Sequence, residues 1–258
     1  MTLSHYIILL DTLARFRLRA ETRRYYLGYL WWILEPLLYV AVFYIVFEKL
    51  LNARQPEFLV SLMVGKLTFI WFSKSVTQAA TSLELNKGLM AQLDIPKHLF
   101  PLSVLHEGLY RQSAVFAFLG VFLVVEGHTP NALWWWLLAL FVIQYLLIVG
   151  VALIAALLVC VQRDFQVLVQ LGMVFLLFMS GIFWDIRSIQ DPVVQDWLLR
   201  LNPMAVLVDA YRQVLLWNEV PSASYLTWVL AKALALLALG ALCYRRLHFW
   251  INERVITR

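Results

Sequence analysis

Five arginines stand directly before a long apolar run near the start of the chain. They fall within residues 15–24, and residues 30–51 beyond them are mostly hydrocarbon. A run of about 20 apolar residues is long enough to cross the hydrocarbon core of a bilayer. Basic residues next to the first span mark the cytoplasmic side, and the first span usually sets the orientation of later ones. The sequence therefore predicts a membrane protein whose N-terminus is cytoplasmic.

The amino-acid composition extends this interpretation to the whole chain. Of the 258 residues, 62% are hydrophobic and 14% are charged, whereas soluble domains carry about 25% charged residues. The chain has too little polar surface for a water-facing globule, so we expect one integral membrane domain over residues 1–258. The net charge of +5 gathers at the ends of apolar segments, which indicates membrane topology and not nucleic-acid binding.

Six apolar segments are predicted to span the membrane, with both termini in the cytoplasm. Residues 4–24 have a basic amphipathic pattern typical of a helix in the membrane interface, although a soluble helix packed on a partner has the same pattern. This topology places twelve Lys and Arg residues on the cytoplasmic side and five on the other, which is the expected bias. The predicted spans are about 30–51, 58–81, 102–125, 133–161, 165–184 and 225–244.

Two segments between the spans are predicted to form short helices. In residues 84–98 a helix is expected to end before Pro96, because proline disfavours helical geometry in the residue before it. Residues 186–220 hold two apolar pieces around Asn202-Pro203, each too short to cross a bilayer. We interpret this segment as a re-entrant or interfacial hairpin, with an ordinary loop outside the membrane as the alternative.

The second predicted span is unusually polar. A charge at the bilayer centre costs about 2.5–3.5 kcal/mol on insertion scales, so Lys66 and Lys74 are expected to face the bundle interior, a cavity or an interface. Aromatic residues make up 15% of the chain, and their flat faces suit sugar rings, although anchoring and packing account for much of this content. Candidate residues lining a passage are Tyr39, Phe43, Tyr44, Lys66, Phe69, Trp71, Phe72 and Lys74.

The sequence carries no recognisable motif for chemistry. Gly65-Lys66 lacks the flanking residues of a P-loop, and no hydrolase or zinc motif occurs. Cys160 and Cys243 lie in apolar spans and are interpreted as packing residues, not as disulfide partners or metal ligands. Active transport would then draw its energy from a partner or an ion gradient. A membrane-embedded enzyme acting on polyprenyl phosphates is the alternative, with Glu35, His106, Glu107 and Arg111 as its candidate groups.

In their order, these features resemble the permease subunit of type-2 ABC exporters, particularly those that move lipid-linked O-antigen, capsule-like or teichoic-acid-like polysaccharides. The resemblance covers nearly the whole chain. It departs at Asp94-Ile95, where relatives often carry a basic or aromatic residue. The matching pieces are Leu27-Gly28, Leu30-Trp31 and Pro36 after the basic lead-in, then Asn86 to Pro96 with Pro101, Arg163-Asp164, Asn202-Pro203 and Arg212.

The resemblance implies a homodimer in a bacterial inner membrane, paired with two ATPase subunits that bind and hydrolyse ATP with Mg²⁺. The chain itself would be a transport subunit and not an enzyme, and would bind no cofactor. A type-2 permease for a drug or a smaller lipid is the alternative within transport.

The resemblance also implies roles for particular residues. At the lipid entrance, basic side chains would meet a diphosphate head group, and these are Arg15, Arg19, Arg23 and Arg24. In the coupling helix that docks on the ATPase, the residues are Asn86, Lys87, Leu89, Met90, Leu93 and Pro96. In the gate on the far side of the membrane, they are Trp197, Asn202, Pro203 and Arg212.

Overall fold

A computed structural model describes residues 3–24, 26–50, 57–92 and 95–247, and within these ranges the chain is helical with no strand. The N-terminal half contains α1 (Leu3–Arg24), the 3₁₀ turn η1 (Gly28–Leu30), α2 (Trp31–Tyr44) with its π-helical continuation η2 (Ile45–Leu50), α3 (Phe58–Ala80), α4 (Ser82–Leu85), α5 (Lys87–Gln92) and α6 (Leu99–Val125). The C-terminal half contains η3 (Ala132–Trp135), α7 (Trp136–Val161), α8 (Phe165–Met179), η4 (Ile186–Ser188), α9 (Pro192–Leu201), α10 (Pro203–Arg212), η5 (Gln213–Trp217) and α11 (Ala223–Arg246).

Four of the described helices are long and apolar enough to cross a membrane. They are α3, α6, α7 with the preceding η3 turn, and α11, and their bounds lie within about three residues of four predicted spans. The other two predicted spans correspond to shorter helices, since α2 and η2 together cover residues 31–50 and α8 has 15 residues. Within the described residues an all-helical fold with four candidate membrane spans is confirmed, whereas the count of six spans stays a prediction.

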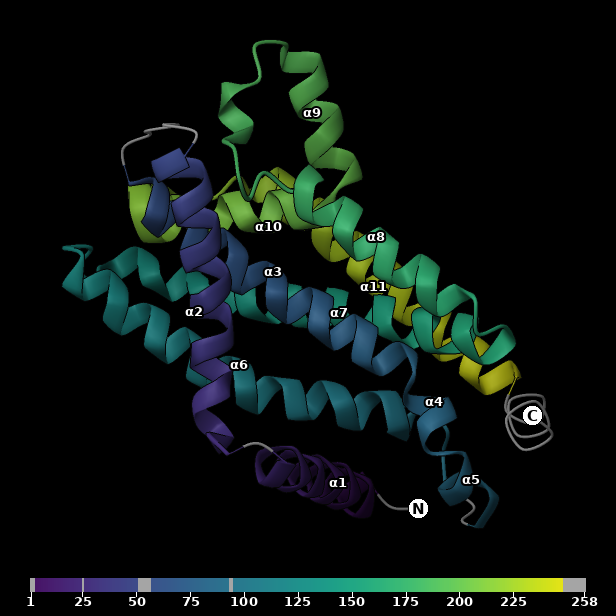
Figure 1. Ribbon diagram of the computed structural model, residues 1–258. Coiled ribbons are helices and arrows are strands. Elements are labelled where there is room, and N and C mark those ends of the chain that lie inside the picture. Colours follow the sequence, from purple (N-terminus) through teal and green to yellow (C-terminus); the bar gives the residue numbers. More distant parts are fainter. Residues whose placement is uncertain (1–2, 25, 51–56, 93–94, 248–258) are drawn as a thin grey trace.

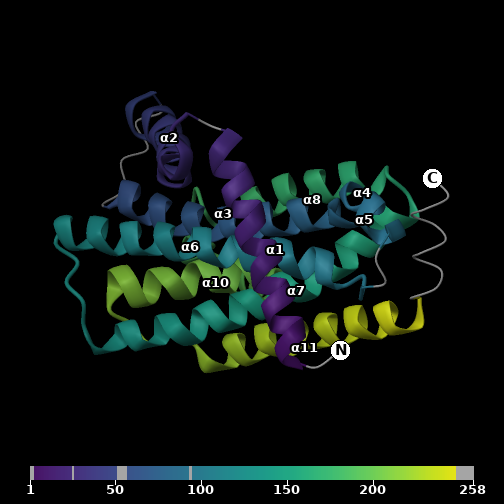
Figure 2. The same ribbon diagram turned by 90° about the horizontal axis from the view of Figure 1, so that it is seen from below.

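Helix α3 lies at the centre of the bundle and contacts α2, α6, α7, α8 and α10. Figure 1 shows α4 and α5 near the start of α8 at one end of the bundle and α9 protruding from the other end. In Figure 2, α1 runs across α6 at a steep angle to the bundle helices, and the two helices are in contact. Both ends of the bundle therefore carry helices that do not follow its axis.

The central position of α3 explains why this span tolerates polar residues. Thr68 and Ser75 are buried, and the Thr68 hydroxyl donates to the carbonyl of Val64 one turn earlier, at 2.8 Å. Gln144 of α7 donates to the Thr68 carbonyl across the helix contact, at 2.9 Å. Hydrogen bonds of this kind satisfy polar groups away from water and join neighbouring membrane helices.

Helices α7 and α11 meet at two glycines. A Cβ at Gly150 would lie 2.9 Å from Leu236 Cβ, and one at Gly240 would lie 3.0 Å from Leu153 Cβ. Helices that associate in lipid lack a hydrophobic driving force, so close backbone approach at small residues is a main source of their packing energy. These two glycines fix the parallel pairing of α7 with α11.

Helix α8 ends at Met179, earlier than the predicted end of this span at residue 184. Gly181 follows with φ of +67°, and a Cβ there would lie 2.6 Å from Ile186 Cγ1. A positive φ and this lack of space favour glycine. The chain therefore turns at Gly181, even though the residues that follow are still apolar.

Candidate functional site

A polar pocket of about 340 Å³ lies between the start of α2, α3 and α6. The Lys74 ammonium of α3 is 2.5 Å from the Glu35 carboxylate of α2, and each side chain is about one-third exposed. Opposite charges that pair in this way reduce the cost of placing both in a membrane segment. The described lining residues are Gly28, Trp31, Trp32, Glu35, Lys74, Gln78 and Arg111.

Arg111 forms the α6 wall of this pocket and belongs to a second ion pair. Arg111 donates to Glu107 one turn earlier at 2.8 Å, and both side chains are buried. The amide nitrogen of the neighbouring Gln112 is buried without a hydrogen-bond partner among the described residues. Two indoles, the Lys74–Glu35 pair, the Arg111 guanidinium and the Gln78 amide thus line this pocket, a mixture that suits polar, ring-shaped or phosphorylated ligands.

Helix α1 is tied to α6 next to this pocket. Asp11 accepts a 2.6 Å hydrogen bond from Tyr110 and pairs with Arg15 at 2.8 Å, and His106 lies 3.5 Å from the same carboxylate. Hydrogen bonding from Tyr110 first, and then from Arg15, holds the pKa of Asp11 below its ordinary value. The contact joins the predicted interface helix to a helix of the bundle, and no sequence pattern had indicated it.

The structure describes the side chains of two of the four predicted head-group arginines, Arg15 and Arg19. Arg15 is paired with Asp11 and its side chain is 64% exposed, and Arg19 is also exposed. The side chains of Arg23 and Arg24 lie outside the described part of the chain. Their role at a lipid entrance stays a prediction.

The predicted passage-lining residues separate into two groups. Phe69, Trp71 and Phe72 are buried inside the chain, and the Trp71 ring stacks on Phe141 at a centroid distance of 4.5 Å. These rings contribute to the packing of α3 within this chain.

The remaining candidates lie on α2 and α3. Lys66 is buried with its ammonium 5.3 Å from the centre of the half-exposed Tyr39 ring. Lys49 lies 5.8 Å from the Tyr44 ring, and the side chain of Phe43 is not among those described. The structure thus brings Tyr39 to Lys66 and Glu35 to Lys74, two cross-helix pairs that sequence reasoning had not connected.

The described coupling residues lie between α4 and α5, on α5 and in the segment before α6. Leu85 and Leu89 are exposed at 76% and 42%, whereas Met90 is buried. Lys87 is also exposed, Asn86 donates to the Ser82 carbonyl at 2.6 Å, and Leu93 is outside the described residues. Pro96 lines a separate cavity beside α11.

An ion pair links this segment to the turn between α7 and α8. Arg163 donates to the Glu84 carboxylate at 2.9 Å. Figure 1 shows α4 and α5 together at one end of the bundle, and the exposed Leu85 and Leu89 are apolar side chains of the kind that mark protein contacts.

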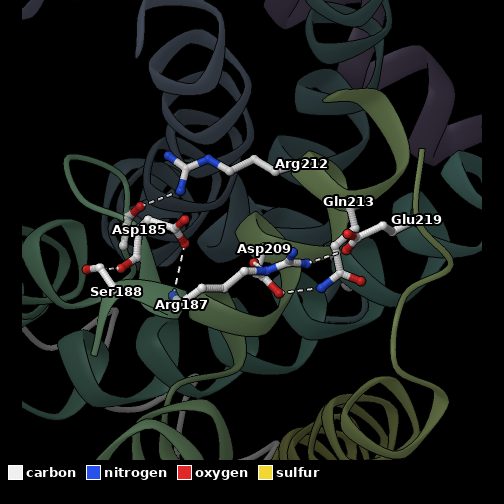
Figure 3. Close-up of polar contacts among 8 residues, drawn as sticks. Asp185, Arg187, Ser188, Asp209, Arg212, Gln213 and Glu219 are labelled. Carbon is white, nitrogen blue, oxygen red and sulfur yellow. Dashed lines mark hydrogen bonds and ion pairs between the residues drawn. The ribbon is translucent and has the colours of Figure 1, made fainter. Parts of the chain in front are cut away.

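At the opposite end, Arg212 and Asn202 hold the α8–η4 loop against the hairpin. Figure 3 shows Arg212 beside the loop that carries Asp185 and Ser188. The Arg212 guanidinium donates to the carbonyls of Gly181 at 2.6 Å, Ile182 at 2.9 Å and Ser61 at 3.2 Å. Asn202 accepts from the Met204 amide, caps α10, and donates to the Met179 carbonyl at 3.1 Å. One arginine and one asparagine thus satisfy carbonyls that the end of α8 leaves open.

A cluster of charged residues joins the two ends of the 186–220 hairpin segment. Arg187 pairs with Glu219 at 2.7 Å and with Asp209 at 3.7 Å (Figure 3). Its guanidinium lies 4.2 Å from the centre of the Trp217 ring. Asp209 also accepts from Gln213. Sequence reasoning missed this cluster, because its members are spread over 33 positions, Arg187 to Glu219, in no fixed spacing.

The other predicted gate residues have different surroundings. Pro203 occupies the first turn of α10, directly after the capping Asn202, an arrangement favoured at helix starts. Trp197 is 61% exposed on α9. A pocket of about 350 Å³ lies between the α8–η4 loop and the start of α3. Its walls include Ser61, Asp185, Arg212 and Trp217.

The groups proposed for a polyprenyl-phosphate enzyme occur as separate pairs. Glu35 is paired with Lys74, Glu107 with Arg111, and His106 lies near Asp11. Among the described contacts, no base orients a nucleophile, so the geometry gives this alternative no support.

This chain is similar to known proteins over most of its length. A family model described as "ABC-2 type transporter" matches residues 9–216. Two proteins of Klebsiella pneumoniae, both named O-antigen export system permease protein RfbA, are 28% and 26% identical over 88% of this chain and 87% and 86% of their own lengths. A protein of the same name from Myxococcus xanthus is 28% identical over 89% of this chain and 88% of its own length.

Proposed function

This chain belongs to the ABC-2 type transporter family, and from that premise we propose that it is the membrane subunit of an exporter of lipid-linked polysaccharide. In this proposal the substrate is an O-antigen-like, capsule-like or teichoic-acid-like polymer that crosses a bacterial inner membrane. A separate ATPase subunit supplies the energy. The names of the three relatives, which match nearly the full chain, support this substrate class.

The observation that carries the proposal is the polar pocket between α2, α3 and α6. It adjoins the basic helix α1 and combines Trp31 and Trp32 with Lys74 and Arg111. Indoles offer flat faces to sugar rings, and cations attract a diphosphate linker. A drug or simple lipid would need the apolar walls but not the Lys74–Glu35 pair or the Arg111 guanidinium.

The proposed assembly is a homodimer with six spans per chain and cytoplasmic termini. Helix α2 exposes Leu38, Tyr39 and Val42, and α8 exposes Leu171 and Phe175. These apolar faces are suited to lipid or to a second copy of the chain. In the same assembly the 186–220 segment forms the hairpin at the far side of the membrane.

The surface of α4 and α5 is proposed to dock on the ATPase. Leu85 and Leu89 are the exposed apolar anchors, and buried Met90 fixes α5 to the bundle. Because Glu84 pairs with Arg163, a displacement of this surface by the ATPase would be transmitted to the start of α8.

In this proposal the energy comes from the separate ATPase subunit. The purified chain alone should hydrolyse no ATP, and hydrolysis by the single chain would contradict the proposal.

The experiment that tests the function is deletion of the gene followed by complementation. Loss of the chain should abolish surface polysaccharide and leave polymer in the cytoplasm. Normal surface polymer together with lost drug resistance would favour a drug permease instead.

Variants of the Lys74–Glu35 pair test whether the pocket itself handles substrate. Lys74→Ala should lower both membrane levels and export, because it leaves Glu35 uncompensated. The double variant Glu35→Ala with Lys74→Ala removes both charges and should recover membrane levels but not export. Recovery of export as well would mean that the pair is only structural. Val121→Ala, on an exposed apolar face of α6, is the control and should change neither quantity.

A further inference from the structure

A cavity of about 600 Å³ lies between the start of α6 and the second halves of α7 and α11. It is separate from the polar pocket, and the proposed function makes no use of it. Most of its wall is apolar, formed by Leu102, Val149, Leu153, Leu237 and Ala241.

The glycine contact between α7 and α11 creates the apolar part of this cavity. Gly150 and Gly240 bring the two helix axes together, while Val149, Leu153 and Leu237 next to them point along the cavity wall. Helices in contact at small residues leave a groove beside the contact when a third helix does not fill it. Here the third helix is α6, which reaches the groove only near its first turns.

The other end of the cavity is polar and basic. His98, Tyr244 and Arg245 line it, and none of the described lining residues is acidic. Tyr244 is 5% exposed, and its hydroxyl has no hydrogen-bond partner in the described part of the chain. A buried hydroxyl without a partner is unfavourable, so a hydrogen-bond acceptor at this point would be favourable.

The two ends lie in the order of an amphipathic molecule within a bilayer. Arg245 and Arg246 close the last turn of α11, and in the proposed topology this turn faces the cytoplasm. The apolar wall lies one to three turns deeper, where acyl chains are found. Basic pockets between membrane helices on the cytoplasmic side attract anionic lipid head groups.

We propose that this cavity binds an anionic phospholipid of the cytoplasmic leaflet. One acyl chain occupies the apolar part, and the phosphate group accepts hydrogen bonds from the Tyr244 hydroxyl and the Arg245 guanidinium. The proposal depends on the orientation of the chain in the membrane but not on which substrate is exported. Failure of one therefore leaves the other intact.

The position of the cavity gives the bound lipid a structural consequence. The His98 ring lies 6.1 Å from the Tyr244 ring and 5.8 Å from the Tyr6 ring of α1. A lipid at this point contacts α6 and α11 directly and lies beside the contact between α6 and α1. It also adjoins Pro96, at the end of the coupling segment, so lipid binding should stabilise the attachment of that segment to the bundle.

Native mass spectrometry of the purified full chain, titrated with phosphatidylglycerol, tests the proposal. Wild type should bind phosphatidylglycerol about tenfold more tightly than phosphatidylcholine, because only the former carries net negative charge. Arg245→Gln should weaken phosphatidylglycerol binding by about tenfold. Arg246→Gln, which removes the same charge from the next position outside the cavity, should keep the wild-type affinity.

Two further variants separate the cavity from a general surface charge. Tyr244→Phe keeps the ring and removes only the hydroxyl, and it should weaken binding without a loss of folded protein. Ala241→Phe should fill the apolar part and also weaken binding. Equal losses in Arg245→Gln and Arg246→Gln, or undiminished binding in Tyr244→Phe and Ala241→Phe, would overturn the proposal. Binding of a polyprenyl diphosphate in preference to phosphatidylglycerol would overturn it too.

Discussion

Arg212 donates a 2.6 Å hydrogen bond to the carbonyl of Gly181, and this contact fixes where α8 ends. The arginine comes from α10, 31 positions later in the chain. It also reaches Ile182 and Ser61, so a single buried guanidinium joins the α8 end, the hairpin and α3.

Replacing Arg212 by methionine should strongly destabilise the protein. The substitution keeps much of the side-chain length but leaves three carbonyls without their donor, at about 1–3 kcal/mol for each group that stays buried. The expected result is a lower midpoint of thermal unfolding in detergent and less folded protein in the membrane. Arg200→Met, at an exposed position on α9, is the matched control, and an equal effect there would contradict this role of Arg212.

Gly181→Ala should destabilise the same region from the other side of the contact. The added Cβ would lie 2.6 Å from Ile186 at a φ of +67°, which costs about 1–2 kcal/mol for the backbone conformation alone. Gly120→Ala is the control, because a Cβ at this helical glycine meets nothing within 4 Å, and alanine favours the helix by about 0.8–1 kcal/mol. Thermal unfolding of both variants should therefore shift in opposite directions.

Arg212 and Gly181 show which part of the fold could not be predicted from the sequence. Hydropathy located α3, α6, α7 and α11, because each span is long and apolar along its own sequence. The end of α8 depends on Arg212 and Asn202, more than 20 positions later, so no local pattern contained it. Asn202-Pro203 was locally informative, because a capping residue followed by proline begins a helix.

The sequence also could not predict which faces of α3 are buried against other helices. Polar residues on this span indicated that it avoids lipid, and the structure places Lys66 inside the bundle and Lys74 beside Glu35. Which aromatic rings face outward was not predictable, since α3 is surrounded by helices on most sides. Phe69, Trp71 and Phe72 are buried within this chain, and Tyr39 on α2 is half-exposed.

The hairpin should lose order in acid. Hydrogen bonding from Arg187 holds the pKa of Glu219 below its ordinary value, and Arg200 and then Tyr225 do the same for Asp196. A carboxyl whose pKa is lower in the folded state stabilises that state above its ordinary pKa and loses this contribution as the pH falls through its folded value. Both carboxyls are at the surface, so the effect should be local and begin below about pH 4.

Hydrogen exchange, corrected for the intrinsic rate at each pH, measures this effect. Wild type should lose amide protection around residues 217–219 between pH 5 and pH 3. Arg187→Gln should start with less protection at pH 5 and lose little more, because the partner that lowers the Glu219 pKa is gone. An unchanged acid response in this variant would show that another group is responsible.

The ion pair between Glu84 and Arg163 should matter for coupling more than for folding. The pair is at the surface, where such contacts contribute about 0–1 kcal/mol to stability, yet it joins α4 to the turn before α8. Arg163→Glu places two like charges together and should reduce polysaccharide export while membrane levels stay normal. Glu84→Arg with Arg163→Glu restores opposite charges and should recover export. If the double variant exports no better than Arg163→Glu alone, then Arg163 acts through contact with the ATPase and not through its pairing with α4.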